Sequence, residues 1–299
     1  MSGAAELVTT IAEVRRKVAL SRRGGSVISL VPTMGALHEG HGALMDCARR
    51  PGNFVVVSIF VNPIQFDRPD DYRAYAIDLD EDVRFCLARG VDMVFAPTAA
   101  EMYPEPQRAY VEVAGLGDHL CGRFRPGHFR GVATVVAKLF AIVQPDQAFF
   151  GEKDAQQLAI IQRMTSDLDF PIEIVPVPTV REPDGLALSS RNRRLTPEER
   201  RVAPALYRAL ELARDRITAG AGVVSARQSA LAALGEFPEI RVEYFEVVDA
   251  ATMEPVVQVT APARIAVAAR LGNTRLIDNI RFQHPCGSLL QGTDRNSLS

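Results

Sequence analysis

The chain has 299 residues, of which 47% are hydrophobic and 23% charged, and its formal net charge is −2. This composition is typical of a globular protein with roughly two domains and excludes a disordered chain. The near balance of charge gives no electrostatic basis for a nucleic acid as partner. No apolar run approaches the roughly 18 residues of a membrane span, and the four cysteines are scattered as in a reduced compartment. We therefore expect a cytoplasmic protein that binds neither nucleic acid nor membrane.

The first strand–loop–helix junction lies near the N-terminus. Residues 1–19 have an amphipathic pattern that predicts a surface helix and not a signal peptide. An apolar run, Val27–Val31, predicts a strand, and a helix is expected over Ala43–Arg50. The loop between them contains Met34, Gly35 and Gly40. Unpaired N–H groups and the positive end of the helix dipole suit this junction to phosphate binding.

Two of the five histidines, His38 and His41, lie in this loop. Their rings can donate hydrogen bonds to phosphoryl oxygens and stabilise the charge that develops during a displacement. Two alternatives stay open at this point. The histidines can belong to an ordinary surface turn, or they can bind a metal together with a further ligand elsewhere in the chain.

The next apolar run, Phe54–Val61, predicts a strand that is buried on both faces and completes a βαβ unit. Asn62 and Gln65 follow the carboxyl end of this strand. Because ligands bind at this edge of a parallel sheet, the two amides are candidates to bind a polar substrate. A turn formed for conformational reasons explains Asn62 equally well, but it does not explain Gln65.

The acidic residues Asp78, Asp80, Glu81 and Asp82 precede a helix that ends near Gly90. We interpret most of them as caps and dipole partners, and a magnesium role for one of them stays open. A third short strand is expected over residues 92–96.

Residues 102–131 form an irregular segment, within which 123–130 concentrate three arginines and a histidine. Guanidinium groups suit phosphate or carboxylate, so this segment is a candidate anion site. A helix is expected over Val132–Val143.

A second strand–loop–helix junction follows. The strand Gln147–Phe150 leads through Gly151, Glu152, Lys153 and Asp154 into a helix over Ala155–Asp167. Lys153 would supply a mobile charge for a phosphate chain, and Gln157 lies in the first helical turn. The alternative is a surface Glu-Lys-Asp triplet that caps the helix.

A proline-rich strand, residues 171–180, precedes a change in composition, and we place the domain boundary near Thr179. Helices over 198–219 and 225–234 and strands over 242–248, 264–269 and 274–279 follow. The prediction is an α/β fold in which residues 1–179 form a Rossmann-like doubly wound parallel sheet. Residues 180–282 would form a smaller α+β lid domain, and 283–299 a disordered tail. Ser189, Ser190 and Arg191 lie in a loop beside the boundary, where they are placed to close over a nucleotide.

Together these segments resemble the pantothenate synthetase (pantoate–β-alanine ligase) family. The motifs that carry the resemblance are PTMGALHEGH at 32–41, FVNPIQF at 60–66, RPGHFRGV at 125–132, FFGEKDAQQL at 149–158, SSRN at 189–192 and ARLGNTRLIDNI at 269–280. They cover nearly the whole chain in order, and their combination is specific. The His-x-Gly-His element alone would indicate only the wider nucleotidyltransferase superfamily.

The resemblance implies a two-step, ATP-dependent ligase with Mg²⁺. Pantoate would attack the α-phosphate of ATP, and β-alanine would then displace AMP from the pantoyl adenylate. Among the implied catalytic residues, His41 and His38 would contact the phosphates together with Lys153 and Arg191. The implied nucleotide site comprises Met34, Gly35, His38, Gly40, His41, Gly151, Glu152, Lys153, Asp154, Val180, Leu188, Ser189, Ser190 and Arg191. Gln65 and Gln157 would bind pantoate with Asn62 beside them, and members are typically homodimers.

The chain departs from the family pattern at several positions: Cys121 replaces a glutamate, Leu188 a methionine and Ala155 an aromatic residue, and Ala76-Ile77-Asp78 replaces Pro-Arg-Thr. An alternative is therefore a diverged member that joins a different small acid and amine. A noncatalytic nucleotide-binding protein is the rival from another class, and the retained histidines, Lys153 and paired glutamines argue against it.

Overall fold

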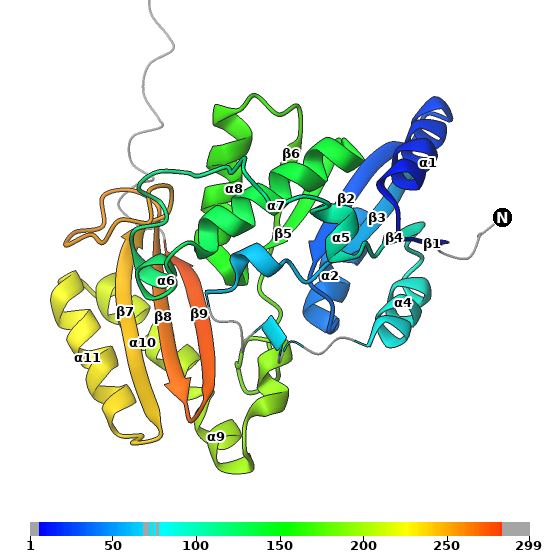
Figure 1. Cartoon of the computed structure of the whole chain (residues 1–299). Helices are drawn as coiled ribbons and strands as arrows, with labels where there is room; N and C mark the ends of the chain where they lie inside the picture. The colour runs from blue at the N-terminus through cyan, green and yellow to red at the C-terminus, as the bar shows by residue number, and fades with distance from the viewer. Residues whose placement is uncertain (1–5, 68–71, 74, 76–77, 283–299) are drawn as a thin grey trace, which may run out of the picture. The chain divides into compact units, whose positions relative to one another are not determined.

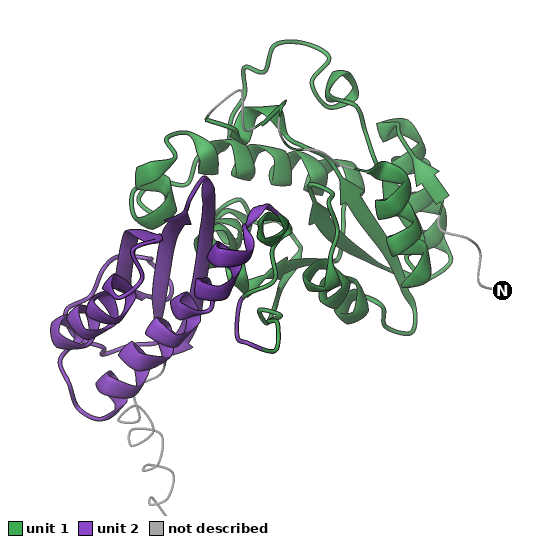
Figure 2. Ribbon diagram, turned by 90° about the horizontal axis from the view of Figure 1, so that it is seen from below, with its two compact units in different colours: residues 1–183, 187–193 green, residues 184–186, 194–299 purple. Residues whose placement is uncertain are grey.

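The computed structural model describes residues 6–67, 72–73, 75 and 78–282. The chain divides into two compact units, coloured separately in Figure 2. Unit 1 comprises residues 1–183 and 187–193, and unit 2 comprises 184–186 and 194–299. Unit 1 thus continues past Thr179 and includes the loop that carries Ser189, Ser190 and Arg191.

Unit 1 is built on a six-stranded parallel sheet with the strand order β1-β4-β3-β2-β5-β6 (Figure 1). The strands are β1 (Glu6–Val8), β2 (Val27–Thr33), β3 (Asn53–Ile59), β4 (Met93–Phe95), β5 (Gln147–Gly151) and β6 (Glu173–Val177). In β2, Ile28, Leu30 and Val31 are all fully buried, which shows that side chains cover both faces of the sheet. The predicted α/β, doubly wound parallel fold is confirmed.

The helices of unit 1 supply that cover. Among the described residues they include α1 (Ile11–Arg23), α2 (Glu39–Ala48), α4 (Leu79–Ala88), α5 (Ala99–Met102), α6 (Leu120–Phe124), α7 (His128–Val143) and α8 (Ala155–Asp167). Met45 of α2 and Cys86 of α4 share a core cluster with Val57 of β3 and Phe149 of β5. Helices α1 and α7 contact each other and β2, and α8 contacts α7, β5 and β6. None of the helices in the described ranges combines the length and apolar character needed to cross a bilayer.

The strand order reverses direction beside β2. From β2 the chain proceeds through α2, β3 and α4 to β4, and it later returns to place β5 on the opposite side of β2. Loops that leave the carboxyl ends of β2 and β5 therefore run to opposite sides of the sheet. Such a switch point opens a crevice, and it is the usual ligand site of open α/β sheets.

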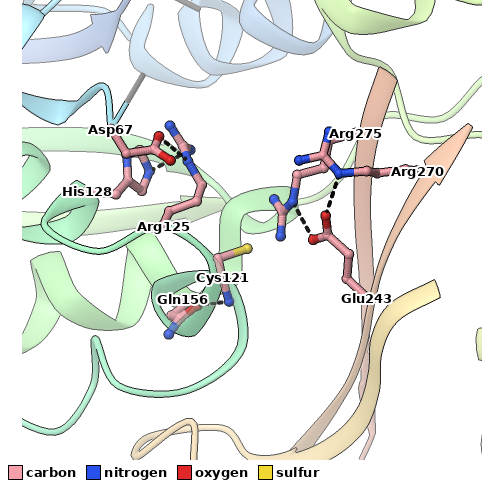
Figure 3. Close-up of polar contacts among 8 residues, drawn as sticks. All are labelled: Asp67, Cys121, Arg125, His128, Gln156, Glu243, Arg270 and Arg275. Atoms are coloured by element: carbon pink, nitrogen blue, oxygen red, sulfur yellow. Dashed lines mark hydrogen bonds and ion pairs between the residues drawn. The ribbon is translucent and has the colours of Figure 1, made fainter. Parts of the chain in front are cut away.

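Unit 2 contains a three-stranded antiparallel sheet, β7 (Ile240–Asp249), β8 (Ala263–Leu271) and β9 (Thr274–Phe282), in the order β7-β8-β9. Its helices are α9 (Pro197–Val202), α10 (Ala205–Thr218) and α11 (Val223–Gly235). Apolar residues of α10, α11 and the strands form a separate core, among them Leu210, Phe245 and Val267. Across the sheet, the Glu243 carboxylate accepts from Arg270 Nε at 2.9 Å and Arg275 Nε at 2.7 Å (Figure 3).

The structure differs from the sequence prediction at several places. The segment predicted to be irregular, 102–131, contains α6, and α7 starts at His128, four residues before the predicted start. Residues 6–8 form β1, a strand at the edge of the sheet that pairs with β4, and the helix starts only at Ile11. Helix α2 starts at Glu39 and not near Ala43, because His38 caps it. The helix predicted over 198–219 is two helices, α9 and α10, with Pro204 before the second. The predicted disordered tail, 283–299, lies outside the described residues.

Candidate functional site

A cavity of about 230 Å³ opens in unit 1 beside the carboxyl ends of β2 and β5. Most residues that the sequence assigns to a site line it: Met34, His38, Gly40, His41, Gln65, Gly151, Lys153, Asp154, Gln157, Val180, Leu188, Ser189, Ser190 and Arg191. Gly35, Glu152 and Asn62 are not part of its wall. Four segments that are far apart in the sequence therefore meet at the switch point.

The loop between β2 and α2 has an unusual backbone conformation. Gly35 and Ala36 have φ angles of 82° and 52°, in the left-handed region, which favours glycine and is uncommon for alanine. At the start of α2, His38 Nδ1 accepts from the Gly40 N–H at 3.0 Å, and His41 Nδ1 accepts from the His38 N–H at 3.3 Å. A Cβ atom on Gly40 would lie 2.8 Å from the His38 ring, so a larger residue there would displace the ring. The loop thus orders both rings at the helix N-terminus.

A buried carboxylate holds this loop from the other side. Asp82, in the first turn of α4, is 3% exposed and accepts from the N–H groups of Ala36 at 2.9 Å and Leu37 at 2.7 Å. Burial raises the pKa of Asp82, and the two backbone hydrogen bonds oppose that rise. The sequence suggested a cap or dipole role for this carboxylate, and its distant partners have no signal in the local pattern. Asp78, by contrast, does cap α4 by accepting from the Glu81 N–H.

Both histidines of the cavity are neutral near pH 7. Burial, together with the positive charges of Lys153 and Arg193, lowers the pKa of His38 to about 4. Burial and the neighbouring His38 ring lower the pKa of His41 to about 3. A neutral imidazole carries one proton, and Nδ1 of each ring accepts a hydrogen bond, so the proton is on Nε2. Each ring therefore has one N–H donor, at Nε2.

The loop after β5 brings charge to the opposite wall. Lys153 Nζ lies 3.9 Å from Asp154 Oδ2, and both residues line the cavity. Partial desolvation in the cavity wall opposes ionisation of Asp154, but the positive charges of Lys153 and Arg191 outweigh it, so the pKa of Asp154 is lower than usual. Because the Asp154 side chain is 48% exposed, solvent screens this pair. Gln157, in the first turn of α8, lines the same cavity.

The segment after β6 closes a further part of the wall. Leu188 donates its N–H to Val180 O at 2.9 Å, next to an antiparallel bridge between Arg181 and Ala187. The Arg191 N–H donates to Ser189 Oγ at 3.3 Å, where a short 3₁₀ helix, η3 (Ser190–Arg194), begins. This hairpin-like loop explains how Val180 and Ser189–Arg191 line one cavity.

An apolar wall completes the cavity, and the sequence prediction did not include it. It consists of Phe60, Val132, Val135, Val136, Leu139, Phe149 and Phe150. Four of these residues lie on α7, a helix whose sequence is apolar on most sides, so its spacing does not show which residues reach a ligand. The wall matches a substrate with an aliphatic part beside its polar groups.

The arginine-rich segment lies elsewhere. Arg123, Arg125 and Arg130 do not line the cavity; Arg130 stacks over the Tyr110 ring at 4.9 Å. Arg125 Nη1 lies 3.0 Å from His128 Nε2, and its Nε lies 3.5 Å from Asp67 Oδ1 (Figure 3). The candidate anion site predicted for this segment is therefore not part of the cavity wall.

Metal binding is the remaining alternative for the two histidines. Among the described residues, no group of three or more His, Cys, Asp or Glu side chains is arranged to hold a metal ion. His38 and His41 bond to the backbone through Nδ1, and no third ligand of those types joins them in the described part of the chain. This arrangement favours the hydrogen-bonding role of the two rings over the metal-binding one.

Comparisons with known proteins identify the family. The family model of pantoate-beta-alanine ligase matches residues 6–281. The pantothenate synthetase of Moorella thermoacetica is 53% identical over 278 residues, which cover 92% of this chain and 98% of that protein. The crystal structure of pantothenate synthetase from Thermus thermophilus superposes with a TM-score of 0.87 at 49% identity, covering 92% of this chain and 98% of that one.

A pantoate-beta-alanine ligase from Francisella tularensis, in complex with beta-gamma ATP and beta-alanine, superposes with a TM-score of 0.76 at 31% identity. It covers 93% of this chain and 97% of that one. Both the sequence and structural matches extend over nearly the whole chain, including every segment that lines the cavity. This chain belongs to the pantoate–β-alanine ligase family.

Proposed function

We propose that this protein joins pantoate to β-alanine in two ATP-dependent steps. In the first, a pantoate carboxylate oxygen attacks the α-phosphorus of ATP, the bond to the bridging oxygen breaks, and pyrophosphate leaves. In the second, the β-alanine amine attacks the acyl carbon of pantoyl adenylate, loses a proton and releases AMP as the amide forms. The observation that carries the proposal is the meeting of His38, His41 and Lys153 with Gln65 and Gln157 in one cavity of a family member.

The phosphate side of the reaction would use donors from both junctions. His38 and His41 each offer an Nε2–H, and Lys153 and Arg191 add positive charge. Negative charge on the phosphoryl oxygens shifts during an in-line displacement, and preorganised donors stabilise it without a protein nucleophile. We assign His41, at the N-terminus of α2, the closest contact with the α-phosphate, and His38, Lys153 and Arg191 the contacts around it.

The rest of the nucleotide would be held by the loops of the same wall. Met34, Gly35 and Gly40 come from the first junction, Gly151, Glu152 and Asp154 from the second, and Val180, Leu188, Ser189 and Ser190 from the loop after β6. Gly35 and Glu152 lie outside the lining, so their part would be to shape the loops. Gln65 and Gln157 would bind the pantoate oxygens, and the apolar wall on α7 would receive its methyl groups.

Mg²⁺ fits this donor set as a partner of ATP. It prefers oxygen ligands and is commonly held by one or two carboxylates plus substrate phosphates. Asp154 is the carboxylate among the described cavity residues, and its lowered pKa keeps it ionised. We propose that Asp154 helps to hold Mg²⁺, which would neutralise phosphate charge when bound.

A diverged specificity is the second candidate, and particular residues favour it. Leu188, which stands where the family pattern has methionine, lines the cavity, and Ala155 starts the helix that carries Gln157. Cys121 is buried on α6 and donates its N–H to Gln156 Oε1 at 3.0 Å (Figure 3). Changes near the cavity can alter the preferred acid or amine while the phosphate contacts stay.

We further propose that the protein acts in the cytoplasm as a homodimer, with unit 2 as a lid that excludes water during catalysis. The family resemblance supports the homodimer, and the scattered cysteines fit a reducing compartment. Sedimentation equilibrium tests the dimer by giving the molecular mass in solution, and a monomer would contradict it.

Product analysis tests the proposed reaction. The protein is incubated with ATP, Mg²⁺ and pantoate, with β-alanine or one of several other amines, and the products are identified by mass spectrometry. Pantothenate and AMP in equal amounts are the expected result with β-alanine. Faster amide formation with another acid or amine would support the diverged specificity, and no amide with any pair would contradict both candidates.

A further inference from the structure

The side chain of Asn62 is buried behind the cavity wall with every polar atom bonded. It is 1% exposed, and its Nδ2 donates to Gly131 O and to Gln65 Oε1, both at 3.1 Å. Its Oδ1 accepts from the Tyr103 hydroxyl at 2.8 Å. These contacts join segments that are distant in the sequence. Asn62 itself does not line the cavity, whereas Gln65 does.

One backbone carbonyl fixes the direction of all these hydrogen bonds. The Gly131 oxygen only accepts, so the Asn62 atom that faces it must be the amide nitrogen. The Asn62 oxygen then faces Tyr103, whose hydroxyl must donate. The second Asn62 proton points at Gln65, so the Gln65 atom that faces inward must be its oxygen. The Gln65 nitrogen is left on the outer side.

The outward nitrogen of Gln65 lies at the cavity. Gln65 Nε2 donates to Met34 Sδ at 2.9 Å, and both residues line the wall. A thioether is a weak acceptor that occupies one of the two Nε2 protons, which leaves the other for a ligand. At this point the wall therefore offers a donor, and a ligand must supply an acceptor oxygen.

The backbone of Gln65 is held as firmly as its side chain. His128, 9% exposed, has Nδ1 2.8 Å from Gln65 O, and Arg125 Nη1 lies 3.0 Å from its Nε2 (Figure 3). Arg125 can only donate, so Nε2 accepts and Nδ1–H donates to the Gln65 carbonyl. Gly131 permits the close approach of α7, since a Cβ there would lie 2.5 Å from Ile64 O and 2.6 Å from Gln65 Cα. The conformation of the Gln65 main chain is thus fixed independently of Tyr103.

We propose that Tyr103 and Asn62 are positioning residues that hold the Gln65 amide with its N–H toward the cavity, and so make an acceptor oxygen a requirement for the acid substrate. The proposal rests on the proposed function in one respect, that Gln65 contacts pantoate. It assigns a role to Asn62 behind the wall and not in contact with substrate. It also assigns a role to Tyr103, which no motif in the sequence indicates.

The surroundings of Tyr103 make it suitable for a single-atom test. Its ring packs against Phe60, with centroids 6.1 Å apart, and Lys138 Nζ lies 4.9 Å from the ring centre. Burial raises the pKa of the Tyr103 phenol, so it remains a donor at neutral pH. Tyr103→Phe removes the donor and keeps both ring contacts. Tyr110→Phe is the matched control, because the Tyr110 hydroxyl donates to Gln107 O on the exposed surface.

The test compares these variants in pantoate-dependent exchange of labelled pyrophosphate into ATP. One neutral hydrogen bond corresponds to a change of about threefold to tenfold. We expect Tyr103→Phe to raise KM for pantoate by that factor, with KM for ATP within about twofold of wild type, and Tyr110→Phe to change neither. An unchanged KM for pantoate, or an equal rise in KM for pantoate and for ATP, would overturn the positioning role of Tyr103 and Asn62.

A second measurement needs no substrate. The side-chain amide protons of Asn62 and Gln65, assigned by NMR, should exchange with solvent several times faster in Tyr103→Phe than in wild type or Tyr110→Phe. Equal rates of amide-proton exchange in all three proteins would overturn this positioning role even if the kinetic constants changed. Failure of the wild-type protein to catalyse pantoate-dependent pyrophosphate exchange would contradict the proposed function. The amide-proton signals would still test whether Tyr103 and Asn62 position Gln65.

Discussion

The backbone N–H of Leu37 donates to the buried carboxylate of Asp82 at 2.7 Å, which ties the loop before His38 to a helix 45 residues further along the chain. Asp82 also accepts from Ala36, whose φ of 52° is unusual for a residue other than glycine. A single carboxylate thus satisfies two successive N–H groups in a strained loop. We therefore expect the position of His38 and His41 to depend on this contact as well as on the capping of α2.

Replacement of Asp82 by asparagine should therefore slow adenylate formation. Asparagine has one oxygen for two donors, and its NH₂ group would face the second N–H. We expect kcat for pyrophosphate exchange to fall by about tenfold to a hundredfold, because an unsatisfied N–H would shift the loop and small misplacements of catalytic groups cost about that much in rate. Asp78→Asn is the control on the same helix, since asparagine caps helices as well as aspartate does. Similar losses in both variants would show that α4 matters only for stability.

His41→Ala should abolish most of the adenylation activity and keep the fold. Removal of one preorganised donor to a developing charge costs about 10²–10³ in rate. The variant also loses the acceptor for the His38 N–H, so its melting temperature should fall modestly while the protein stays folded. His119→Ala, at a histidine outside the cavity lining, should retain full activity. A His41→Ala protein that is unfolded at room temperature would instead show that the ring is a structural element.

The neutral histidines give a pH prediction. Burial lowers the pKa of His38 and His128 to about 4 and that of His41 to about 3. NMR signals of these rings, assigned with single variants, should not titrate between about pH 8 and about 5.5. Between the ordinary value of 6.5 and these lower values the folded protein binds fewer protons than the unfolded chain. The contribution of these three histidines to the free energy of unfolding is present above pH 6.5 and is lost as the pH falls toward 4. A midpoint near the ordinary value for any of the three would contradict the burial argument.

Gly131→Ala should destabilise the protein, although alanine normally favours helices. In α7 the new Cβ would lie 2.5 Å from Ile64 O, which is backbone and cannot easily move. Overpacking of this kind costs about 1–3 kcal/mol. Gly235→Ala is the matched control in α11, where a Cβ meets nothing within 4 Å, and it should leave stability equal or slightly higher. Urea unfolding measures the free energy of unfolding of both variants. Equal stability of the two would contradict the close contact at Gly131.

The local sequence predicted most of the sheet and the segments that form the cavity. The apolar runs of β2, β3 and β5 are buried on both faces, and the residues directly after them line the site. Strand β1 was missed because three residues are too few to show a pattern, and its pairing partner β4 is distant in the chain. The break at Pro204 did have a local signal, because proline in a helix interior removes a backbone hydrogen bond, and the helix predicted over 198–219 did not take it into account.

The supporting contacts had no local signal. In the sequence, Asp82 looks like an ordinary acidic residue in the first turn of a helix. Only the fold brings it to Ala36 and Leu37. His128 lay in a segment whose arginines suggested anion binding, yet it donates to the backbone of Gln65. Such contacts join residues 45 to 63 positions apart, so spacing cannot indicate them. The cavity residues that the sequence indicated follow strand ends, whereas the contacts between distant segments depend on tertiary structure.

The most direct test of the central claim is pyrophosphate exchange with wild-type protein in the absence of any amine. Labelled pyrophosphate, ATP and Mg²⁺ are incubated with pantoate or with each of several other small hydroxy acids. We expect rapid incorporation of label into ATP with pantoate and little with the other acids, since an acyl adenylate forms reversibly before the amine binds. Exchange that proceeds equally without an acid, or no exchange with any acid, would contradict the assignment of the cavity to carboxylate adenylation.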